Sequence, residues 1–270
     1  MGWVSVKILS FIKRILSKNC QFIVKFDLFL TKGDFLYLYQ PTKGYAYNSD
    51  SIFLYDFISS FNPKGKLLDV GCGVGIISLL LTRDFNIETT IIDKQELMLK
   101  YAIHNYALNS LDVESFLGDF TESLHDKKFD FVVSNPPFYD SNVTQSENEH
   151  LNIARYAHHL PIELFVNQVK KVLKPRGRFI FCYDAKQVDI LLHALKEAKI
   201  NPEVIRFVHS KIDRDSKLVM ISARMNSKSM MKIMPPLIVF DKDSNYNEEA
   251  ERVFFKAGTN SIKGDYDIGK

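Results

Sequence analysis

The stretch LLDVGCGVGI, residues 67–76, decides the fold of this 270-residue chain. Lys66 to Val70 is a short apolar strand, and glycines at positions 71, 73 and 75 follow it before a helical apolar pattern begins at Ile76. A glycine loop between a strand and a helix is typical of a parallel α/β sheet, where such a loop lies at the ligand-binding edge. The missing side chains let the backbone approach a ligand closely.

Strands and helices alternate on both sides of this loop. The segments 203–210 and 217–225 are joined by a short charged turn, which predicts two antiparallel neighbours. The sequence therefore predicts an α/β fold, a doubly wound, mostly parallel seven-stranded sheet with an antiparallel last strand. The other expected strands are 66–70, 89–92, 113–117, 129–134 and 178–183, and the expected helices are 52–58, 76–81, 96–108, 162–173 and 188–198.

Three parts of the chain are expected. Residues 1–62 form a basic N-terminal extension, with a hairpin in Phe26 to Tyr39 and then a helix. Residues 63–226 form the domain that contains the sheet. Residues 227–270 form a tail with a polar helix, and its last dozen residues are expected to be mobile because little there can be buried.

Composition and charge exclude several classes of protein. With 46% apolar and 13% aromatic residues, the chain is not disordered or fibrous. The net charge of +3 does not indicate a polyanionic partner, but six bases face one acid in the first 32 residues. An amphipathic helix is expected there that packs on the body, touches RNA or lies on a membrane surface. No uncharged apolar run reaches the roughly 20 residues that span a bilayer, so we expect no stable membrane insertion.

The three cysteines, at positions 20, 72 and 182, include no CxxC pair. Free thiols suit a reducing compartment, so we expect a cytoplasmic protein. We expect no metal site.

Acidic residues follow the second and third predicted strands. Asp93 is placed to accept hydrogen bonds from both hydroxyls of an unphosphorylated ribose. The alternative is that Asp93 is a solvated acid at the end of a strand. Asp119, directly after Gly118, is able to receive the amino group of a purine. A dinucleotide fingerprint requires a third glycine where this chain has Ile76, so a pyrophosphate is disfavoured. These residues indicate a nucleoside-bearing cofactor.

The run SNPPFY follows the fourth predicted strand. The Asn135 side-chain oxygen and the Pro136 main-chain oxygen can accept the two N–H groups of an exocyclic amine, which localises its lone pair toward an electrophile. Pro137 stiffens this geometry, and Phe138 or Tyr139 can stack on a planar target. The alternative is a proline-rich turn without chemistry.

DVGCGVG, Asp93, Asp119 and NPPF, in this order, resemble the class I S-adenosylmethionine-dependent methyltransferases over roughly residues 64–225. The antiparallel last strand is typical of their Rossmann-like fold. The resemblance implies S-adenosyl-L-methionine as the cofactor. It implies that Gly71, Gly73 and Gly75 flank its methionine part, that Asp69 lies near its ammonium group, that Asp93 holds the ribose and Asp119 the adenine amino group, and that Asn135, Pro136 and Phe138 grip the target nitrogen.

Flanking stretches narrow the resemblance. QPTKGYAYNSDS at residues 40–51, Ala154-Arg155-Tyr156 with Leu160, and PLIVF at residues 236–240 look like the bacterial tRNA1(Val) adenine-37 N6-methyltransferase family. The implied activity is methyl transfer to adenine N6 in the anticodon loop of a tRNA. Arg155 would either contact a phosphate near the target nucleotide or cap a helix.

The segment 205–232 holds seven bases against two acids. It is expected either to form a phosphate-binding rim or to be a solvated charged face. Motifs similar to NPPF also occur in methyltransferases that act on guanine N2 of rRNA, on adenine in DNA or on glutamine in proteins, so these substrates are alternatives. An alternative from another functional class is a non-catalytic RNA-binding protein that retains the fold. A nicotinamide oxidoreductase is a further alternative, which Ile76 disfavours. The sequence leaves the oligomeric state open.

Overall fold

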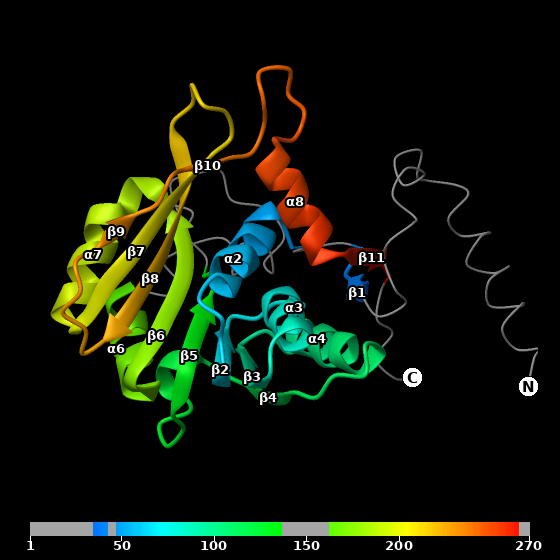
Figure 1. Ribbon diagram of the computed structural model, residues 1–270. Coiled ribbons are helices and arrows are strands. Elements are labelled where there is room, and N and C mark those ends of the chain that lie inside the picture. Colours follow the sequence, from blue (N-terminus) through cyan, green and yellow to red (C-terminus); the bar gives the residue numbers. More distant parts are fainter. Residues whose placement is uncertain (1–34, 43–46, 137–161, 265–270) are drawn as a thin grey trace, which may run out of the picture. The chain divides into compact units, whose positions relative to one another are not determined.

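A mixed β-sheet forms the centre of the structure (Figure 1), a computed structural model that describes residues 35–42, 47–136 and 162–264. The chain separates into two units, Met1–Phe35 and Leu36–Lys270, and every described helix and strand belongs to the second. In these described segments the sheet has nine strands in the order β10-β7-β8-β6-β5-β2-β3-β4, with β9 beside β7. Its strands are β2 (Gly65–Val70), β3 (Ile87–Asp93), β4 (Glu114–Leu117), β5 (Phe129–Ser134), β6 (Leu173–Asp184), β7 (Ile200–His209), β8 (Ser216–Met225), β9 (Lys232–Ile233) and β10 (Leu237–Ile238).

The predicted fold class is confirmed by this topology. The strands β2 to β6 are parallel to their neighbours in this group, whereas β8 runs antiparallel to both β6 and β7. Within the described ranges, seven of the nine strands have four or more residues, and the two-residue strands β9 and β10 extend the sheet beside β7.

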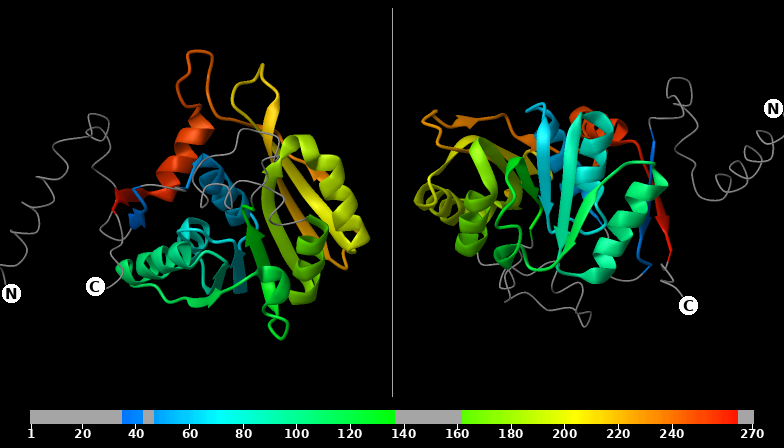
Figure 2. Two further views of the ribbon diagram at one scale, coloured as in Figure 1. Left: turned by 180° about the vertical axis from the view of Figure 1, so that it is seen from behind. Right: turned by 90° about the horizontal axis from the view of Figure 1, so that it is seen from below.

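Helices cover both faces of the sheet (Figures 1 and 2). From β2 the chain moves outward through α3 and α4 to β4, and from β5 it moves in the other direction through α6 and α7 to β7. Because crossovers between parallel strands are right-handed, these two progressions place their helices on opposite faces. The helices are α2 (Ser49–Ser59), α3 (Ile76–Asp84), α4 (Glu96–Leu108), α6 (Ile162–Val172), α7 (Val188–Glu197) and α8 (Glu248–Ala257).

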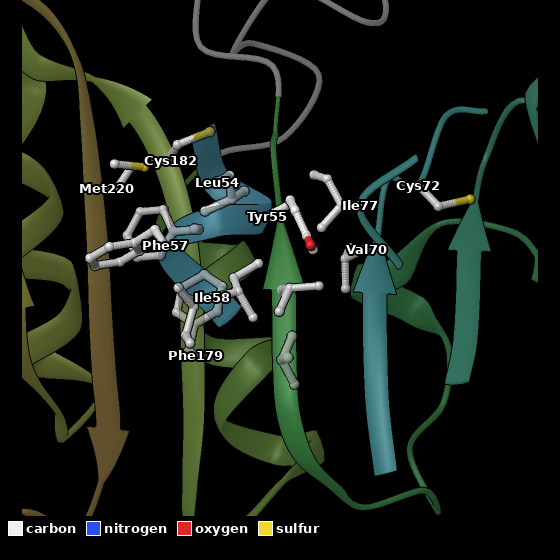
Figure 3. Close-up of a cluster of buried hydrophobic side chains, with 14 of the residues drawn as sticks. Leu54, Tyr55, Phe57, Ile58, Val70, Cys72, Ile77, Phe179, Cys182 and Met220 are labelled. Atoms are coloured by element: carbon white, nitrogen blue, oxygen red, sulfur yellow. The ribbon is translucent and has the colours of Figure 1, made fainter. Parts of the chain in front are cut away.

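Helix α2 lies across the sheet and carries much of the core (Figure 3). It contacts α3, α8 and β6, so most of its circumference is buried. Phe57 and Ile58 face Phe179 of β6 in the close-up, and all three are at most 2% exposed. This packing fixes the first turn of α2 near the carboxyl ends of β5 and β6.

A second, two-stranded sheet joins distant parts of the chain. Strand β1 (Leu36–Gln40) pairs in parallel with β11 (Thr259–Lys263). The expectation of a mobile final dozen residues is therefore wrong for 259–263, because the backbone of this polar segment is paired with β1. The first half of the expected hairpin, the N-terminal helix and residues 265–270 lie outside the described residues.

Candidate active site

The carboxyl ends of β2, β3, β4 and β5 meet at one edge of the sheet. Val70 pairs with both Ile92 and Ser134, and Asp93 pairs with Leu117. The segments that follow these strands therefore start at the same level of the sheet. They are the glycine loop, the start of α4, and the segments that contain Asp119 and Asn135. The loop after β2 and the motif after β5 come from adjacent strands.

The glycine loop is held in a tight turn by its neighbours. Gly71 and Cys72 donate backbone hydrogen bonds to the carbonyl of Ile92 at 2.9 and 3.3 Å. Gly71 has a φ of +66°, and a Cβ added there would meet no atom within 4 Å. Gly75 has a φ of +84°, and a Cβ there would lie 3.1 Å from Ala102 Cβ in α4. Gly71 thus borders open space, whereas Gly75 allows α4 to pack closely on the loop.

Asp69 lies beneath this loop and is 1% exposed. Its Oδ2 accepts a hydrogen bond from the backbone N–H of Ser78 in α3 at 3.3 Å. Its Oδ1 has no hydrogen-bond partner among the described residues. Burial raises the pKa of Asp69 to about 6. A buried carboxylate oxygen without a donor fits a ligand that brings a positively charged donor.

Asp93 connects the glycine loop to the start of α4. Its Oδ2 accepts from the Gly73 N–H at 2.9 Å, and its Oδ1 accepts from the Gln95 N–H at 2.8 Å. The side chain is buried, and burial raises its pKa. Both oxygens keep a further lone pair, so the carboxylate is fixed in place and still able to accept hydroxyl donors.

Asp119 follows Gly118 and caps a short 3₁₀ turn, Phe120–Glu122. Its Oδ1 accepts from the Thr121 backbone N–H at 2.8 Å and from the Thr121 hydroxyl at 2.7 Å. The structure thus assigns Asp119 a local structural role. Contact with an adenine amino group through its other oxygen stays a prediction.

Asn135 lies where β5 ends and is partly exposed, and the next residue, Pro136, is buried. The Asn135 Nδ2 donates to Ser51 Oγ of α2 at 3.1 Å. The Asn135 Oδ1 accepts from the thiol of Cys182 in β6 at 3.0 Å. An amide oxygen has two lone pairs and an amide nitrogen two protons, so each atom keeps one free position. The predicted residues Pro137, Phe138, Tyr139 and Arg155 lie outside the described residues.

Sequence reasoning missed three polar partners in this region. Ser51 and Cys182 contact Asn135, and Asn105 of α4 is fully buried beside the glycine loop. Asn105 donates to the carbonyls of Val74 and Tyr39 at 2.9 and 3.0 Å and accepts from the Tyr39 N–H at 2.7 Å. The available signal for Asn105 was a polar residue on an otherwise apolar helix face.

The predicted basic rim at 205–232 is divided by the structure. Arg206 is 7% exposed and donates to both carboxylate oxygens of Glu249, and Arg224 pairs with Glu203. These two arginines are therefore structural, which corrects the expectation that they line a phosphate-binding rim. The turn between β7 and β8 lies level with the carboxyl end of β6, since Leu218 pairs with Asp184.

The chain matches the methyltransferase small domain family over residues 49–198. It belongs to this family. Membership confirms the class expected from the sequence, an S-adenosylmethionine-dependent methyltransferase. The buried, unpartnered oxygen of Asp69 and the open space at Gly71 fit the charged methionine part of this cofactor, and Asp93 fits its ribose.

Two kinds of RNA methyltransferase are similar to this methyltransferase. A tRNA1(Val) (adenine(37)-N6)-methyltransferase of Actinobacillus pleuropneumoniae is 22% identical over 205 residues, which cover 74% of this chain and 85% of the relative. One from Pedobacter heparinus is 27% identical over 60% of this chain and 70% of the relative. The ribosomal RNA small subunit methyltransferase C of A. pleuropneumoniae is 39% identical, but over only 88 residues, 31% of this chain and 26% of the relative.

Solved structures show the same fold. A predicted O-methyltransferase from Agrobacterium tumefaciens superimposes with a TM-score of 0.61 at 14% identity, over 79% of this chain and 99% of that one. A methyltransferase from Pyrococcus furiosus gives 0.53 at 17% identity, over 70% of this chain and 88% of that one. Within the described segments, the methyltransferase has no helix long and apolar enough to cross a membrane.

Proposed function

We propose that this methyltransferase transfers a methyl group to the N6 amino nitrogen of an adenine in tRNA. The observation that carries the proposal is the position of Asn135 and Pro136, which follow β5 directly beside the strand that leads into the glycine loop. The two acceptors for an amino group thus follow β5, and the glycine loop that fits the cofactor follows the adjacent strand β2.

The extent of the similarity favours adenine in tRNA over guanine in rRNA. The tRNA adenine-N6 relative is matched over 85% of its length, and the rRNA relative over 26% of its length. The match to the tRNA relative therefore includes regions beyond the cofactor fold. Because enzymes that share a fold differ in their substrates, similarity beyond the cofactor fold supports a shared substrate more strongly than similarity within it.

The bound cofactor supplies an electrophilic methyl group on a sulfonium. Asn135 Oδ1, through its free lone pair, and the main-chain oxygen of Pro136 would accept the two N–H groups of the adenine amine. These hydrogen bonds draw the amine away from conjugation with the ring and orient its lone pair for attack. Pro137, Phe138, Tyr139 and Arg155 are proposed to stiffen the motif, stack on the base and hold a nearby phosphate.

The target base must leave its stack to reach these acceptors. Such extrusion costs a few kcal/mol and is least costly for an unpaired loop nucleotide. An anticodon-loop adenine is therefore a suitable substrate.

The test is the identity of the methylated nucleoside. Unmodified tRNA is incubated with the full-length protein and isotopically labelled S-adenosylmethionine, digested, and examined by mass spectrometry. Labelled N6-methyladenosine is the expected product. In parallel reactions, labelled N2-methylguanosine in small-subunit rRNA, N6-methyladenine in DNA or methylglutamine in protein, with none in tRNA, would contradict the proposal.

Loss of catalysis in an RNA-binding protein that keeps the fold predicts a different result. That protein would bind S-adenosylhomocysteine and tRNA but label neither tRNA nor any of the other substrates. A thermal-shift titration that compares S-adenosylhomocysteine with NAD tests the nicotinamide oxidoreductase alternative, since a ligand that binds the native state raises the melting temperature.

A further inference from the structure

Three side chains from separate elements meet at the end of β5. Ser51 is in the first turn of α2, Asn135 follows β5, and Cys182 is near the end of β6. Ser51 and Cys182 are 3% and 0% exposed, and they hold the two ends of the partly exposed Asn135 amide. Figure 3 shows the Cys182 side chain beside α2.

We infer that Ser51 and Cys182 are positioning residues, which set the orientation of the Asn135 amide so that its oxygen is available to the target amine. The inference rests on the proposed function, because it concerns the group proposed to accept the amino protons. Neither Ser51 nor Cys182 is proposed to touch the substrate.

Orientation matters because the oxygen and nitrogen ends of an amide have nearly the same shape. Packing alone does not distinguish them, whereas hydrogen-bond partners do. In the observed orientation, Nδ2 donates to Ser51 Oγ and Oδ1 accepts from Cys182. A rotation by 180° would replace the acceptor offered to the target amine by a second donor.

Cys182 is suited to act as the donor. It is completely buried, and burial together with the nearby negative charge of Asp50 raises the pKa of its thiol well above the ordinary value. The protonated thiol therefore persists at neutral pH and keeps its S–H for Asn135. Asp50 is itself held by a hydrogen bond from Asn48 Nδ2 at 2.9 Å.

The supports come from rigid parts of the fold. Cys182 is in register with Met220 of β8, and its own strand, β6, is paired with β5 on one side and with β8 on the other. Ser51 precedes the buried segment of α2 that packs on β6. Groups fixed in this way hold a reacting partner near its productive geometry, and a displacement of about 1 Å can cost about 100-fold in rate.

The test compares removal and rescue of each hydrogen bond. Cys182→Ala removes the thiol donor, and Ser51→Ala removes the hydroxyl acceptor. Cys182→Ser replaces the thiol by a hydroxyl donor, and Ser51→Thr keeps a hydroxyl acceptor. We expect the alanine variants to lower kcat for tRNA by about 10- to 100-fold, with unchanged affinity for S-adenosylhomocysteine, and the hydroxyl variants to recover most of the rate. Ser59→Ala, which removes a hydroxyl from the other end of α2, is the matched control and should leave kcat unchanged.

Three results would overturn the inference. The first is an unchanged kcat in both alanine variants. The second is an equal loss of kcat in Cys182→Ala and Cys182→Ser, and the third is a loss of kcat accompanied by weaker cofactor binding, because a merely structural role produces the last two patterns.

A second measurement separates this inference from the proposed function. Hydrogen exchange of the Asn135 side-chain NH2, followed by NMR on protein labelled with ¹⁵N-asparagine, requires no substrate. If the wild-type protein does not methylate tRNA, the proposed function fails. Slow exchange in the wild type that becomes fast in Ser51→Ala and Cys182→Ala still supports the positioning, whereas equal exchange in all three overturns it.

Discussion

The backbone N–H of Gly73 donates a hydrogen bond to Asp93 Oδ2 over 2.9 Å. This bond ties the middle of the glycine loop to the end of the next strand. The shape of the cofactor loop and the position of the proposed ribose acceptor therefore depend on one another.

The Asp93→Ala variant removes this bond and the proposed ribose acceptor together. Because a hydrogen bond to a charged group contributes about 1.5–3 kcal/mol, we expect affinity for S-adenosylhomocysteine to fall by roughly 10- to 100-fold. Isothermal titration calorimetry measures the change. Glu88→Gln, on the exposed amino-terminal part of β3, is the control and should bind as the wild type does. Equal affinities in all three proteins would refute the role of Asp93.

Protonation of Asp69 predicts a pH dependence of cofactor binding. Its pKa is raised from 3.8 to about 6, so between these values the folded protein holds a proton that the unfolded chain releases. The contribution of this group to stability is therefore full below about pH 4 and is lost as the pH rises through 6. An ammonium group binds the carboxylate form, so affinity for S-adenosylhomocysteine should rise over the same interval.

Asp69→Asn separates these effects. The variant should bind S-adenosylhomocysteine more weakly at pH 7.5 and should lose much of the rise in affinity near pH 6. It should also be no less stable than the wild type at pH 7.5, because the cost of a buried charge is removed. Calorimetric titrations and melting temperatures at several pH values test both statements. A variant with the wild-type pH profile would show that Asp69 does not face the ammonium group.

Asn135→Ala tests the proposed chemistry directly. We expect transfer to tRNA to fall by at least about 100-fold, since the side chain supplies one of two acceptors for the amine. Affinity for S-adenosylhomocysteine should be unchanged because Asn135 is not among the residues that fit the cofactor. Single-turnover transfer rates measured with saturating tRNA isolate the chemical step. A transfer rate equal to that of the wild type would reject the mechanism.

Asn105 and Asn109 form a matched pair for stability. Both asparagines hydrogen-bond the backbone of β1, but Asn105, in the last turn of α4, is fully buried, whereas Asn109, the residue directly after α4, is partly exposed. Asn105→Ala removes the side-chain partner of the buried Val74 carbonyl and of the part-buried N–H and carbonyl of Tyr39. A buried group left without a partner costs about 1–3 kcal/mol, so this variant should lower the free energy of unfolding more than Asn109→Ala does. Urea unfolding compares the two variants, and equal losses would contradict this assignment.

The turn between β7 and β8 offers a test of tRNA contact. Arg214 and Lys217 are exposed near the carboxyl edge of the sheet, whereas Lys228 is exposed beyond the far end of β8. We expect Arg214→Glu and Lys217→Glu to weaken tRNA binding and to reduce the slope of log affinity against log salt by about 1 each. Lys228→Glu should change neither quantity. Filter binding over a range of salt concentrations measures both, and a uniform response of the three variants would exclude this face as the contact.

Much of the fold followed from local patterns. The glycine loop, the alternation of strands and helices and the closing antiparallel pair are encoded by residues close together in sequence. Asp93 and Asp119 could be placed because parallel strands bring their carboxyl ends to one edge.

Other features required the tertiary structure, because their partners are remote in sequence. Asn135 is 84 residues from Ser51 and 47 from Cys182, and Asn105 is 66 residues from Tyr39. The pairing of β1 with β11 and the pairing of Arg206 with Glu249 are likewise non-local. The sequence by itself determined which chemical groups stand at the ends of the strands. Only the tertiary structure decided which of those groups are fixed, buried or used by the fold, since hydrogen bonding and burial depend on neighbours that the chain brings together when it folds.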